Sequence, residues 1–436
     1  MAQLKIPATA LTVRGGRTLS GTVMVDGSKN AALPLLAAAA VLGKPVTVTN
    51  LPASSDVVAL TTLIASTGVL ANTSGPHTVH FTPNGRVGRI DRALAARIRA
   101  SYYLVPALLA HGVADLPWPG GCNVGERGMD LHFTVYEAFG DTVHTDSNGY
   151  RIILGRARER SLVEIKLPFR SRGTTVVALL RALVAQRPLL LHSPSLSPEV
   201  TGLVEALGLA DHYAAYLPDG ALYVEPGAAC PVRWKVPGDK IEAGTLLCAM
   251  AATGGHGRVL GVDSRHLTPL TTLLTTAGFP IAIVNGGVEL ARGVSPTQKP
   301  IRPIKAIASL ESLSDLDADF EPPLMALALT RTGEHAFADE INPGRHANLL
   351  SQLRRLGAVI VEDSPTACRL TGPQTLTGAR VEALDIRTGA ALMVAALAAE
   401  GTTVVTRVDQ LRRGHADLPG KLRLLGADII DGPPEG

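Results

Sequence analysis

Aromatic residues are scarce in this sequence of 436 residues, where Phe, Tyr and Trp together make up 4%. The formal net charge is only +3, and no run of Lys and Arg stands out. Nucleic-acid binding usually needs a basic surface, often with aromatic rings among the cations. The composition therefore argues against a nucleic-acid partner, and a local group of Arg is better interpreted as a site for a small anion.

Cysteine is also rare, and the four thiols form neither a CxxC pair nor a zinc-like spacing with His. This usage predicts free thiols in a reducing compartment and no bound metal. The N-terminal residues lack the long apolar run of a signal peptide, so we expect a cytoplasmic protein. The longest apolar stretch, 31–42, is too short to span a bilayer and contains Pro34, so we expect a buried helix and no membrane partner.

What the sequence does have is a large apolar fraction of 46% against 18% charged residues. This balance supports a large buried core and two or three domains. A helix that ends in Gly and leads into a short strand recurs six times, roughly 70 residues apart. The marker glycines, which we expect to be left-handed helix stops, are Gly68, Gly140, Gly208, Gly278, Gly357 and Gly426.

Each marker follows an Ala-rich helix and a strand rich in β-branched residues, and most of them lead into a pair of strands joined by a turn. The repeating unit is therefore predicted to be helix, strand, helix, strand, turn, strand. Units of this size are too large for a thin solenoid. A few of them sharing their helices would make a compact α/β domain, and six would make two domains of three.

Several spaced motifs resemble the enolpyruvyl transferase superfamily, and within it most closely the branch of UDP-N-acetylglucosamine 1-carboxyvinyltransferase. They include DGSKNAALPLLAAA, PGGCNVGERGMDLH, GDKIEAGTLLCAMAA and RRGHADLPGKLRLLGADI. The resemblance implies a two-domain inside-out α/β barrel built from the six repeats, with the active site between the domains. It also implies that residues 1–28 join 237–436 in one domain, whereas 29–236 form the other.

Enolpyruvyl transfer needs cations for the roughly three negative charges of phosphoenolpyruvate, a base for the acceptor hydroxyl and an acid for the methylene carbon. It needs no metal or organic cofactor. Lys29 opens an Ala-rich helix, where a cation suits the helix dipole poorly unless an anion binds beside it. The resemblance makes it a phosphoenolpyruvate contact with a catalytic role, and makes Asn30 a contact to the acceptor. Further positions that match substrate-binding residues of the family are Arg99, Arg345, Asp385, Arg387 and Arg413, the last also counted as catalytic.

Cys122 lies in WPGGCNVGERG, where the density of glycine indicates a loop. Arg127 is five residues away and could lower the pKa of the thiol. The resemblance makes Cys122 the general acid at the methylene carbon and makes Arg127 a phosphate-binding residue of the same loop. The other three cysteines, Cys230, Cys248 and Cys368, are expected to be small buried hydrophobic residues.

The acceptor-activating base matches Asp319, six residues before Met325, although Asp315 and Asp317 are close enough to leave the register open. The acceptor side departs from the cell-wall branch, because its diphosphate-binding segment becomes PFRSRGTT here. The expected acceptor contacts in that segment are Arg170, Ser171, Arg172, Gly173 and Thr174, with a helix beginning near Thr174.

Two Arg residues at a helix start suit a terminal monophosphate, which carries more charge than either phosphate of a diphosphate ester. We therefore expect a uridine nucleotide as acceptor, with the 3′-hydroxyl of UMP favoured, as in relatives of nucleoside-antibiotic pathways. UDP-N-acetylglucosamine, the acceptor in peptidoglycan synthesis, is the alternative. A non-catalytic paralogue that binds nucleotide remains a third hypothesis, and the sequence leaves the oligomeric state open.

Overall fold

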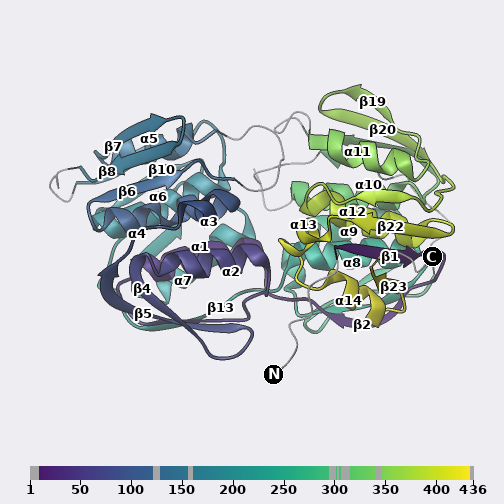
Figure 1. The fold of residues 1–436 in the computed structure, drawn as a ribbon, viewed down its shortest axis with the longest axis horizontal. Helices are drawn as coiled ribbons and strands as arrows, with labels where there is room; N and C mark the ends of the chain where they lie inside the picture. The colour runs from purple at the N-terminus through teal and green to yellow at the C-terminus, as the bar shows by residue number, and fades with distance from the viewer. Residues whose placement is uncertain are drawn as a thin grey trace.

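The computed structural model describes residues 9–120, 128–155, 161–293, 301, 304–305, 315–339 and 345–432, and the side chains at 304, 305 and 345 are not among those described. Two lobes lie side by side (Figure 1). The buried hydrophobic residues form two clusters, one drawn from Ala31 to Val236 and the other from Leu11–Val25 together with Ala243–Ile429. Each lobe therefore has its own core, as the length and the apolar fraction predict.

The first lobe contains three units of the predicted pattern. The first unit comprises α1 (Lys29–Val41), β3 (Val46–Thr49), α2 (Ser55–Ile64), β4 (Thr67–Thr73) and β5 (Thr78–Val87). The second comprises α3 (Arg92–Arg97), the 3-10 helix η1 (Arg99–Leu104), α4 (Val105–Leu109), β6 (Val113–Pro117), α5 (Asp130–Ala138), β7 (Thr142–Asp146) and β8 (Gly149–Ile153). The third comprises β9 (Val163–Lys166), α6 (Arg172–Ala185), β10 (Leu189–His192), α7 (Pro198–Gly208), β11 (Tyr213–Tyr216) and β12 (Leu222–Glu225), and β13 (Val232–Lys235) follows it.

The second lobe repeats the pattern three times more. The fourth unit comprises α8 (Lys240–Ala252), β14 (His256–Leu260), η2 (Ser264–Leu267), α9 (Thr268–Thr276), β15 (Ile281–Val284) and β16 (Gly287–Leu290). The fifth comprises β17 (Ile304–Lys305), η3 (Ala318–Phe320), α10 (Glu321–Ala328), β18 (Gly333–Ala338), α11 (Arg345–Arg355), β19 (Val361–Ser364) and β20 (Ala367–Gly372). The sixth comprises β21 (Arg380–Glu382), α12 (Ile386–Ala398), β22 (Thr402–Thr406), α13 (Val408–Arg412), α14 (Leu418–Leu424) and β23 (Asp428–Asp431). From the start of the chain, β1 (Ala10–Arg14) joins the sheet of the sixth unit, and β2 (Ser20–Met24) joins the sheet of the fourth.

Each unit contributes one small sheet. The strand orders are β13-β3-β5-β4, β6-β8-β7 and β11-β12-β10-β9 in the first lobe, and β15-β16-β14-β2, β17-β18-β20-β19 and β21-β22-β1-β23 in the second. Among the described residues these six sheets are separate and open, so the predicted barrel is not closed by strand pairing. Instead, α8, α10 and α12 contact one another inside the second lobe, and α1 contacts α4 and α6 inside the first.

The central helices are apolar on all sides because they are surrounded by protein. In α1 every residue from Ala31 to Ala40 is buried, which agrees with the buried helix predicted there. Small residues let such helices approach closely. A methyl group at Gly244 of α8 would lie 2.5 Å from the ring of Phe320, so this helix crossing has no room for a larger residue. Of the helices in the described part of the chain, none is both long and apolar enough to cross a membrane.

Five of the six marker glycines have the left-handed backbone that the sequence predicts, with φ between 84° at Gly68 and 99° at Gly426. The prediction is wrong at Gly208, which is the last residue of α7. There the chain turns three residues later, where Asp211 has φ 64°. Asp tolerates this conformation better than most residues, so the helix can end without a left-handed glycine.

The chain crosses between the lobes at two places that lie next to each other. Gly27 and Gly238 form an antiparallel bridge. The Ser28 N–H donates to the Pro237 carbonyl at 2.7 Å, and the Asp239 N–H donates to the Asp26 carbonyl at 2.8 Å. Because α1 and α8 both begin directly after this bridge, the two crossings bring the first residues of these helices to the junction of the lobes.

Candidate active site

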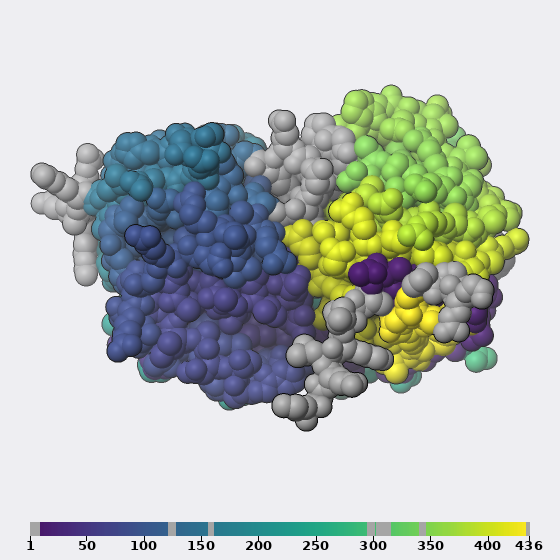
Figure 2. All heavy atoms as spheres, in the orientation of Figure 1, coloured from purple at the N-terminus to yellow at the C-terminus, as the bar shows by residue number. Residues whose placement is uncertain are grey.

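Three charged residues from both lobes meet where α1, α2 and α13 approach. Lys29 is the first residue of α1, after the N-cap Ser28, and its Nζ lies 3.9 Å from Asp56 Oδ2. The Nε of Arg413 lies 3.1 Å from Asp56 Oδ1. One carboxylate thus holds two of the predicted phosphoenolpyruvate cations, Lys29 from the first lobe and Arg413 from the second. In the space-filling view the yellow C-terminal residues meet the blue surface of the first lobe (Figure 2).

Arg413 has two further partners. Its guanidinium donates to Gln410 Oε1 at 3.3 Å and to the carbonyl of Arg97 at 3.4 Å. Nearby, His415 is buried, and burial first and Lys29 second lower its pKa to about 4. A neutral imidazole therefore lies near Lys29 at neutral pH, and it adds no charge to this part of the site.

Arg99 begins η1, and its Nη2 donates to the carbonyl of Gly128 at 3.4 Å. Gly128 follows the segment that holds Cys122 and Arg127, and both of these predicted residues lie outside the described part of the chain. Arg345 is the first residue of α11, but its side chain is also outside the described set. Arg99 is thus the described cation that contacts the end of the predicted cysteine loop.

The helix that the sequence places near Thr174 begins two residues earlier, at Arg172. Ser171 is its N-cap, accepting from the Thr174 N–H at 3.3 Å. A methyl group at Gly173 would lie 2.3 Å from Tyr102 Oη, so glycine is required by close packing. Arg170 donates to the Pro194 carbonyl at 2.5 Å. The five predicted acceptor residues thus lie around one helix start.

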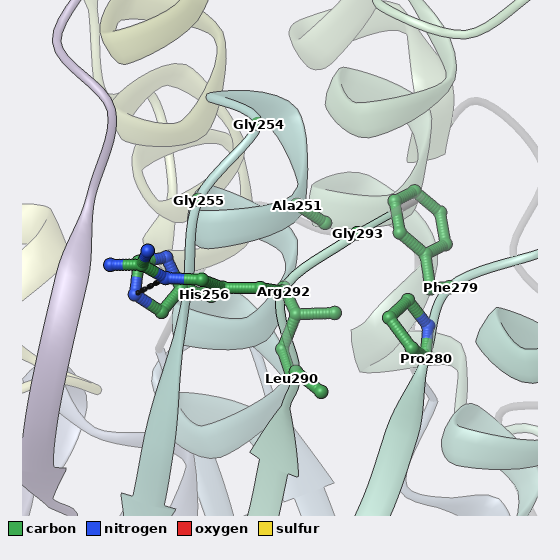
Figure 3. Close-up of a pocket in the computed structure, with 10 residues that line it drawn as sticks. Ala251, Gly254, Gly255, His256, Phe279, Pro280, Leu290, Arg292 and Gly293 are labelled. Atoms are coloured by element: carbon green, nitrogen blue, oxygen red, sulfur yellow. Dashed lines mark hydrogen bonds between the residues drawn. The ribbon is translucent and has the colours of Figure 1, made fainter. Parts of the chain in front are cut away.

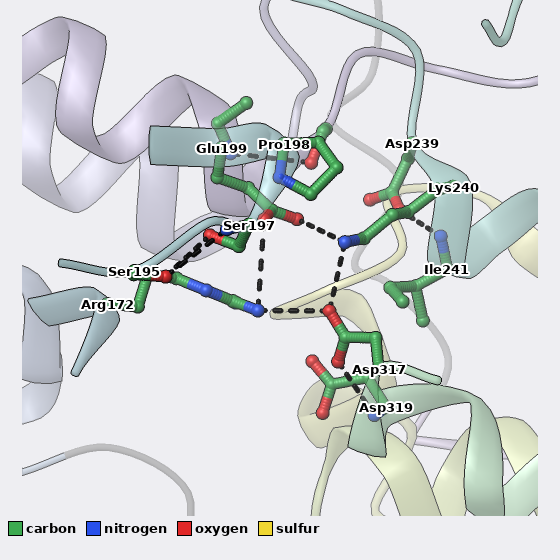
Figure 4. Close-up of polar contacts among 12 residues, drawn as sticks. Arg172, Ser195, Ser197, Pro198, Glu199, Asp239, Lys240, Ile241, Asp317 and Asp319 are labelled. Atoms are coloured by element: carbon green, nitrogen blue, oxygen red, sulfur yellow. Dashed lines mark hydrogen bonds and ion pairs between the residues drawn. The ribbon is translucent and has the colours of Figure 1, made fainter. Parts of the chain in front are cut away.

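Arg172 belongs to a buried cluster of four charges that joins the lobes, and we call it the junction cluster: Arg172, Glu199, Lys240 and Asp317 (Figure 4). Lys240 Nζ lies 3.2 Å from Glu199 Oε1 and 2.9 Å from Asp317 Oδ2. Arg172 Nη2 lies 3.0 Å from Asp317 Oδ2 and 3.8 Å from Glu199 Oε2. Two cations and two carboxylates balance, which is what burial of charge requires.

The ionisation of this cluster follows from that balance. Burial alone would raise the pKa of Glu199, but Arg172 and Lys240 outweigh it and hold the pKa at about 2. Burial likewise opposes the charge on Lys240, but Asp317 and Glu199 raise its pKa above the ordinary value. Glu199 and Lys240 are therefore both charged at neutral pH, and Arg172 has two carboxylates within 4 Å, those of Asp317 and Glu199.

Asp319, the predicted base, is held in place by contacts in the same region. The Asp319 N–H donates to Asp317 Oδ1 at 3.0 Å, and Asp317 is the N-cap of η3, which carries Asp319. The Asp319 carboxylate pairs with Arg387. Asp385 is the N-cap of α12 and accepts from the backbone N–H groups of Arg387 and Thr388. The predicted residues Asp319, Asp385 and Arg387 thus lie together at the start of α12.

Sequence reasoning missed Asp56, Glu199, Lys240 and the structural role of Asp317. A signal for Lys240 was present, because Gly238-Asp239-Lys240 repeats Gly27-Ser28-Lys29 at the start of the fourth unit. The two lysines are equivalent positions of the repeat. Glu199 and Asp56 carry no such signal, since each lies in the first turn of a helix, where an acidic residue is common. Asn30, the remaining predicted contact, follows Lys29 in α1 and is half-buried.

Of the cysteines expected to be buried, Cys248 and Cys368 are, whereas Cys230 is only half-buried. Two cavities among the described residues lie elsewhere. One of ≈ 390 Å³ is lined by His256, Phe279, Arg292 and neighbouring glycines (Figure 3), and one of ≈ 370 Å³ is lined by Arg92, Asp115 and Arg151 among others. Neither is lined by a predicted site residue, and the candidate site is defined by the charged residues at the junction of the lobes.

Known proteins resemble this chain over nearly its whole length. The family model of EPSP synthase (3-phosphoshikimate 1-carboxyvinyltransferase) matches residues 13–422. UDP-N-acetylglucosamine 1-carboxyvinyltransferase 3 of Symbiobacterium thermophilum is 32% identical over 97% of this chain and 97% of its own. The corresponding enzyme of Prosthecochloris aestuarii is 34% identical over 96% of this chain and 97% of its own.

Among solved structures, the enolpyruvyl transferase NikO from Streptomyces tendae superposes with a TM-score of 0.82 at 25% identity, covering 97% of this chain and 99% of its own. EPSP synthase from Acinetobacter baumannii shares the fold, with a TM-score of 0.73 at 15% identity and the same coverage of 97% and 99%. The fold and these full-length likenesses define an enzyme that transfers enolpyruvyl groups. The chain belongs to the EPSP synthase family of enolpyruvyl transferases.

Proposed function

We propose that this enzyme transfers the enolpyruvyl group of phosphoenolpyruvate to a sugar hydroxyl of a uridine nucleotide and releases phosphate. The observation that carries the proposal is the pair of cations, Lys29 and Arg413, that opposite lobes bring to one carboxylate. Phosphoenolpyruvate has about three negative charges and would replace a single protein carboxylate as their partner. Closure of the lobes on this anion would exclude water from the reaction.

In the proposed mechanism Asp319 takes the proton of the acceptor hydroxyl while Cys122 protonates the methylene carbon, and the hydroxyl oxygen bonds to the cationic carbon that results. Loss of a proton from the methyl group then expels phosphate from the tetrahedral intermediate and restores the double bond. Asp317, the neighbouring alternative for the base, already accepts from Lys240, Arg172 and the Asp319 N–H. We therefore assign the base to Asp319.

The remaining predicted residues hold the substrates. Phosphoenolpyruvate binds to Lys29 and Arg413, together with Arg99, Arg127 and Arg345, which would neutralise its phosphate and carboxylate. The acceptor binds along the start of α6 and to Asn30. Asp385 and Arg387 support the base, since Arg387 pairs with Asp319.

The acceptor we favour is UMP, because Arg170 and Arg172 replace neutral residues of the cell-wall branch at a helix start, where a terminal monophosphate binds well. UDP-N-acetylglucosamine is the second candidate, and the names of the relatives at 32% and 34% identity favour it. For UMP to bind as proposed, its phosphate must compete with Asp317 and Glu199 for Arg172.

The test is phosphate release from phosphoenolpyruvate with UMP or with UDP-N-acetylglucosamine, with the product mass confirmed. Turnover with UMP supports the favoured acceptor, whereas turnover with UDP-N-acetylglucosamine alone makes the enzyme one of cell-wall synthesis. Cys122→Ala and Asp319→Asn should each abolish turnover while leaving nucleotide affinity intact. A wild type that binds nucleotide but turns over neither acceptor would instead be the non-catalytic paralogue.

A further inference from the structure

Asp317 makes contacts that no other residue of the junction cluster makes. Its Oδ2 faces both cations of the cluster, Lys240 at 2.9 Å and Arg172 at 3.0 Å. Its Oδ1 faces the other way and accepts from the Asp319 N–H at 3.0 Å. The same residue also accepts through its backbone, since the Phe320 N–H donates to the Asp317 carbonyl at 2.9 Å. One buried side chain therefore connects the cluster to the turn that carries Asp319.

The two cations differ in how firmly they are held. Lys240 is 4% exposed and contacts both carboxylates of the cluster, so it can neutralise Asp317 permanently. The Arg172 side chain is 20% exposed and comes from the other lobe, at the start of α6. If Arg172 turns toward an anion, Asp317 keeps Lys240 and stays paired. The contact between Arg172 and Asp317 can thus change without leaving a buried carboxylate alone.

We propose that Asp317 is a positioning residue, which orients the turn bearing the base Asp319 and couples that turn to Arg172 of the opposite lobe. The inference rests on the proposed function, because it takes Asp319 as the base. Through this contact, the lobe that carries the start of α6 acts on the geometry of the base in the other lobe. The coupling gives a reason for an expensive buried cluster at the junction, beyond holding the lobes together.

Replacing Asp317 should change the charge around Asp319 as well as the geometry of its turn. Among the described residues, the charged and titratable groups near Asp319 or its turn include Arg172, Lys240, Asp317, Arg387 and His415. Glu321, which begins α10, pairs with His346 instead. Replacing Asp317 by a neutral residue leaves one extra positive charge in this set. That charge stabilises the ionised Asp319, so its pKa falls and the base becomes weaker.

The test compares Asp317→Ala and Asp317→Asn with Glu199→Gln as the matched control. Asp317→Ala and Glu199→Gln each remove one carboxylate from the cluster, but only the former removes the acceptor of the Asp319 N–H. We expect Asp317→Ala to lower kcat by at least about tenfold with KM for phosphoenolpyruvate unchanged, while Glu199→Gln stays within about twofold of the wild type. Asp317→Asn keeps an oxygen that can cap the turn and should recover most of kcat.

The pH profile separates positioning from a general loss of structure. In Asp317→Asn the acid limb of kcat should move to lower pH by about one unit, since the base stays ionised further into acid. Equal kinetics for Asp317→Ala and Glu199→Gln, or an unmoved acid limb in Asp317→Asn, would overturn the inference. Wild-type turnover is measured first. A wild type that is inactive with both acceptors refutes the proposed function and this inference together. If the wild type is active, the kinetics of the variants test the role of Asp317 alone.

Discussion

Lys240 offers the sharpest test of what holds the lobes together. It is 4% exposed and contacts Glu199 and Asp317. Lys240→Met keeps the volume of the side chain but removes the charge, which leaves two buried carboxylates with Arg172 as their cation. Breaking a buried charge network in this way costs about 3–5 kcal/mol. In a lobe of some 200 residues this loss lowers the melting temperature by on the order of 10 °C.

The assay is differential scanning calorimetry of the full chain at neutral pH, with two companion variants. Lys44→Met removes an exposed lysine and should change stability by less than about 0.5 kcal/mol. Lys240→Met combined with Glu199→Gln leaves the pair Arg172 and Asp317, 3.0 Å apart, in charge balance. The double variant should therefore recover at least about half of the lost stability. Two results would contradict this reasoning. One is a Lys240→Met protein as stable as Lys44→Met. The other is a double variant whose loss of stability equals the sum of the losses of the two single variants, since the charges would then contribute no pairing energy.

Two further predictions concern the neighbourhood of α6. Burial first and Arg99 second lower the pKa of His132 to about 3, so the folded state excludes a proton that the unfolded state binds below about pH 6.5. The contribution of the neutral His132 to the free energy of unfolding is fully present above that pH and is lost as the pH drops toward 3. His132→Phe should remove about 3 kcal/mol of this acid sensitivity at pH 4.5, as measured by urea unfolding at pH 7 and at pH 4.5. Equal acid sensitivity of the two proteins would refute the assignment. Gly173→Ala places a methyl group 2.3 Å from Tyr102 Oη and should destabilise the protein by about 1–3 kcal/mol, whereas Gly202→Ala in α7, with nothing within 4 Å, should stabilise it by up to about 1 kcal/mol. Melting temperatures that move in the same direction for both alanine variants would contradict the packing described here.

Much of the fold could be read from local patterns. Helix stops and β-branched runs are short-range features, and they located the six units because most elements of each unit are neighbours in the chain; β1, β2 and β13, which join sheets of distant units, were not assigned this way. The same logic failed at Gly208, since an aspartate three residues later could adopt the left-handed backbone instead. The cluster of Asp319, Asp385 and Arg387 came from the family resemblance, and the contact between Asp319 and Arg387 joins residues far apart in the chain.

The sequence by itself determined the period of the repeat, the apolar helices and the family. Only the tertiary structure decided which charges are buried and which residues partner them. Lys29 and Lys240 occupy equivalent places in the repeat, yet the first meets Asp56 and Arg413, whereas the second meets Glu199 and Asp317. Periodicity sets the position of a residue within its own unit. The partner of a buried charge can come from the same unit, as Asp56 does for Lys29, or from the other lobe, as Glu199 does for Lys240, and the energy of burying a charge depends on that partner.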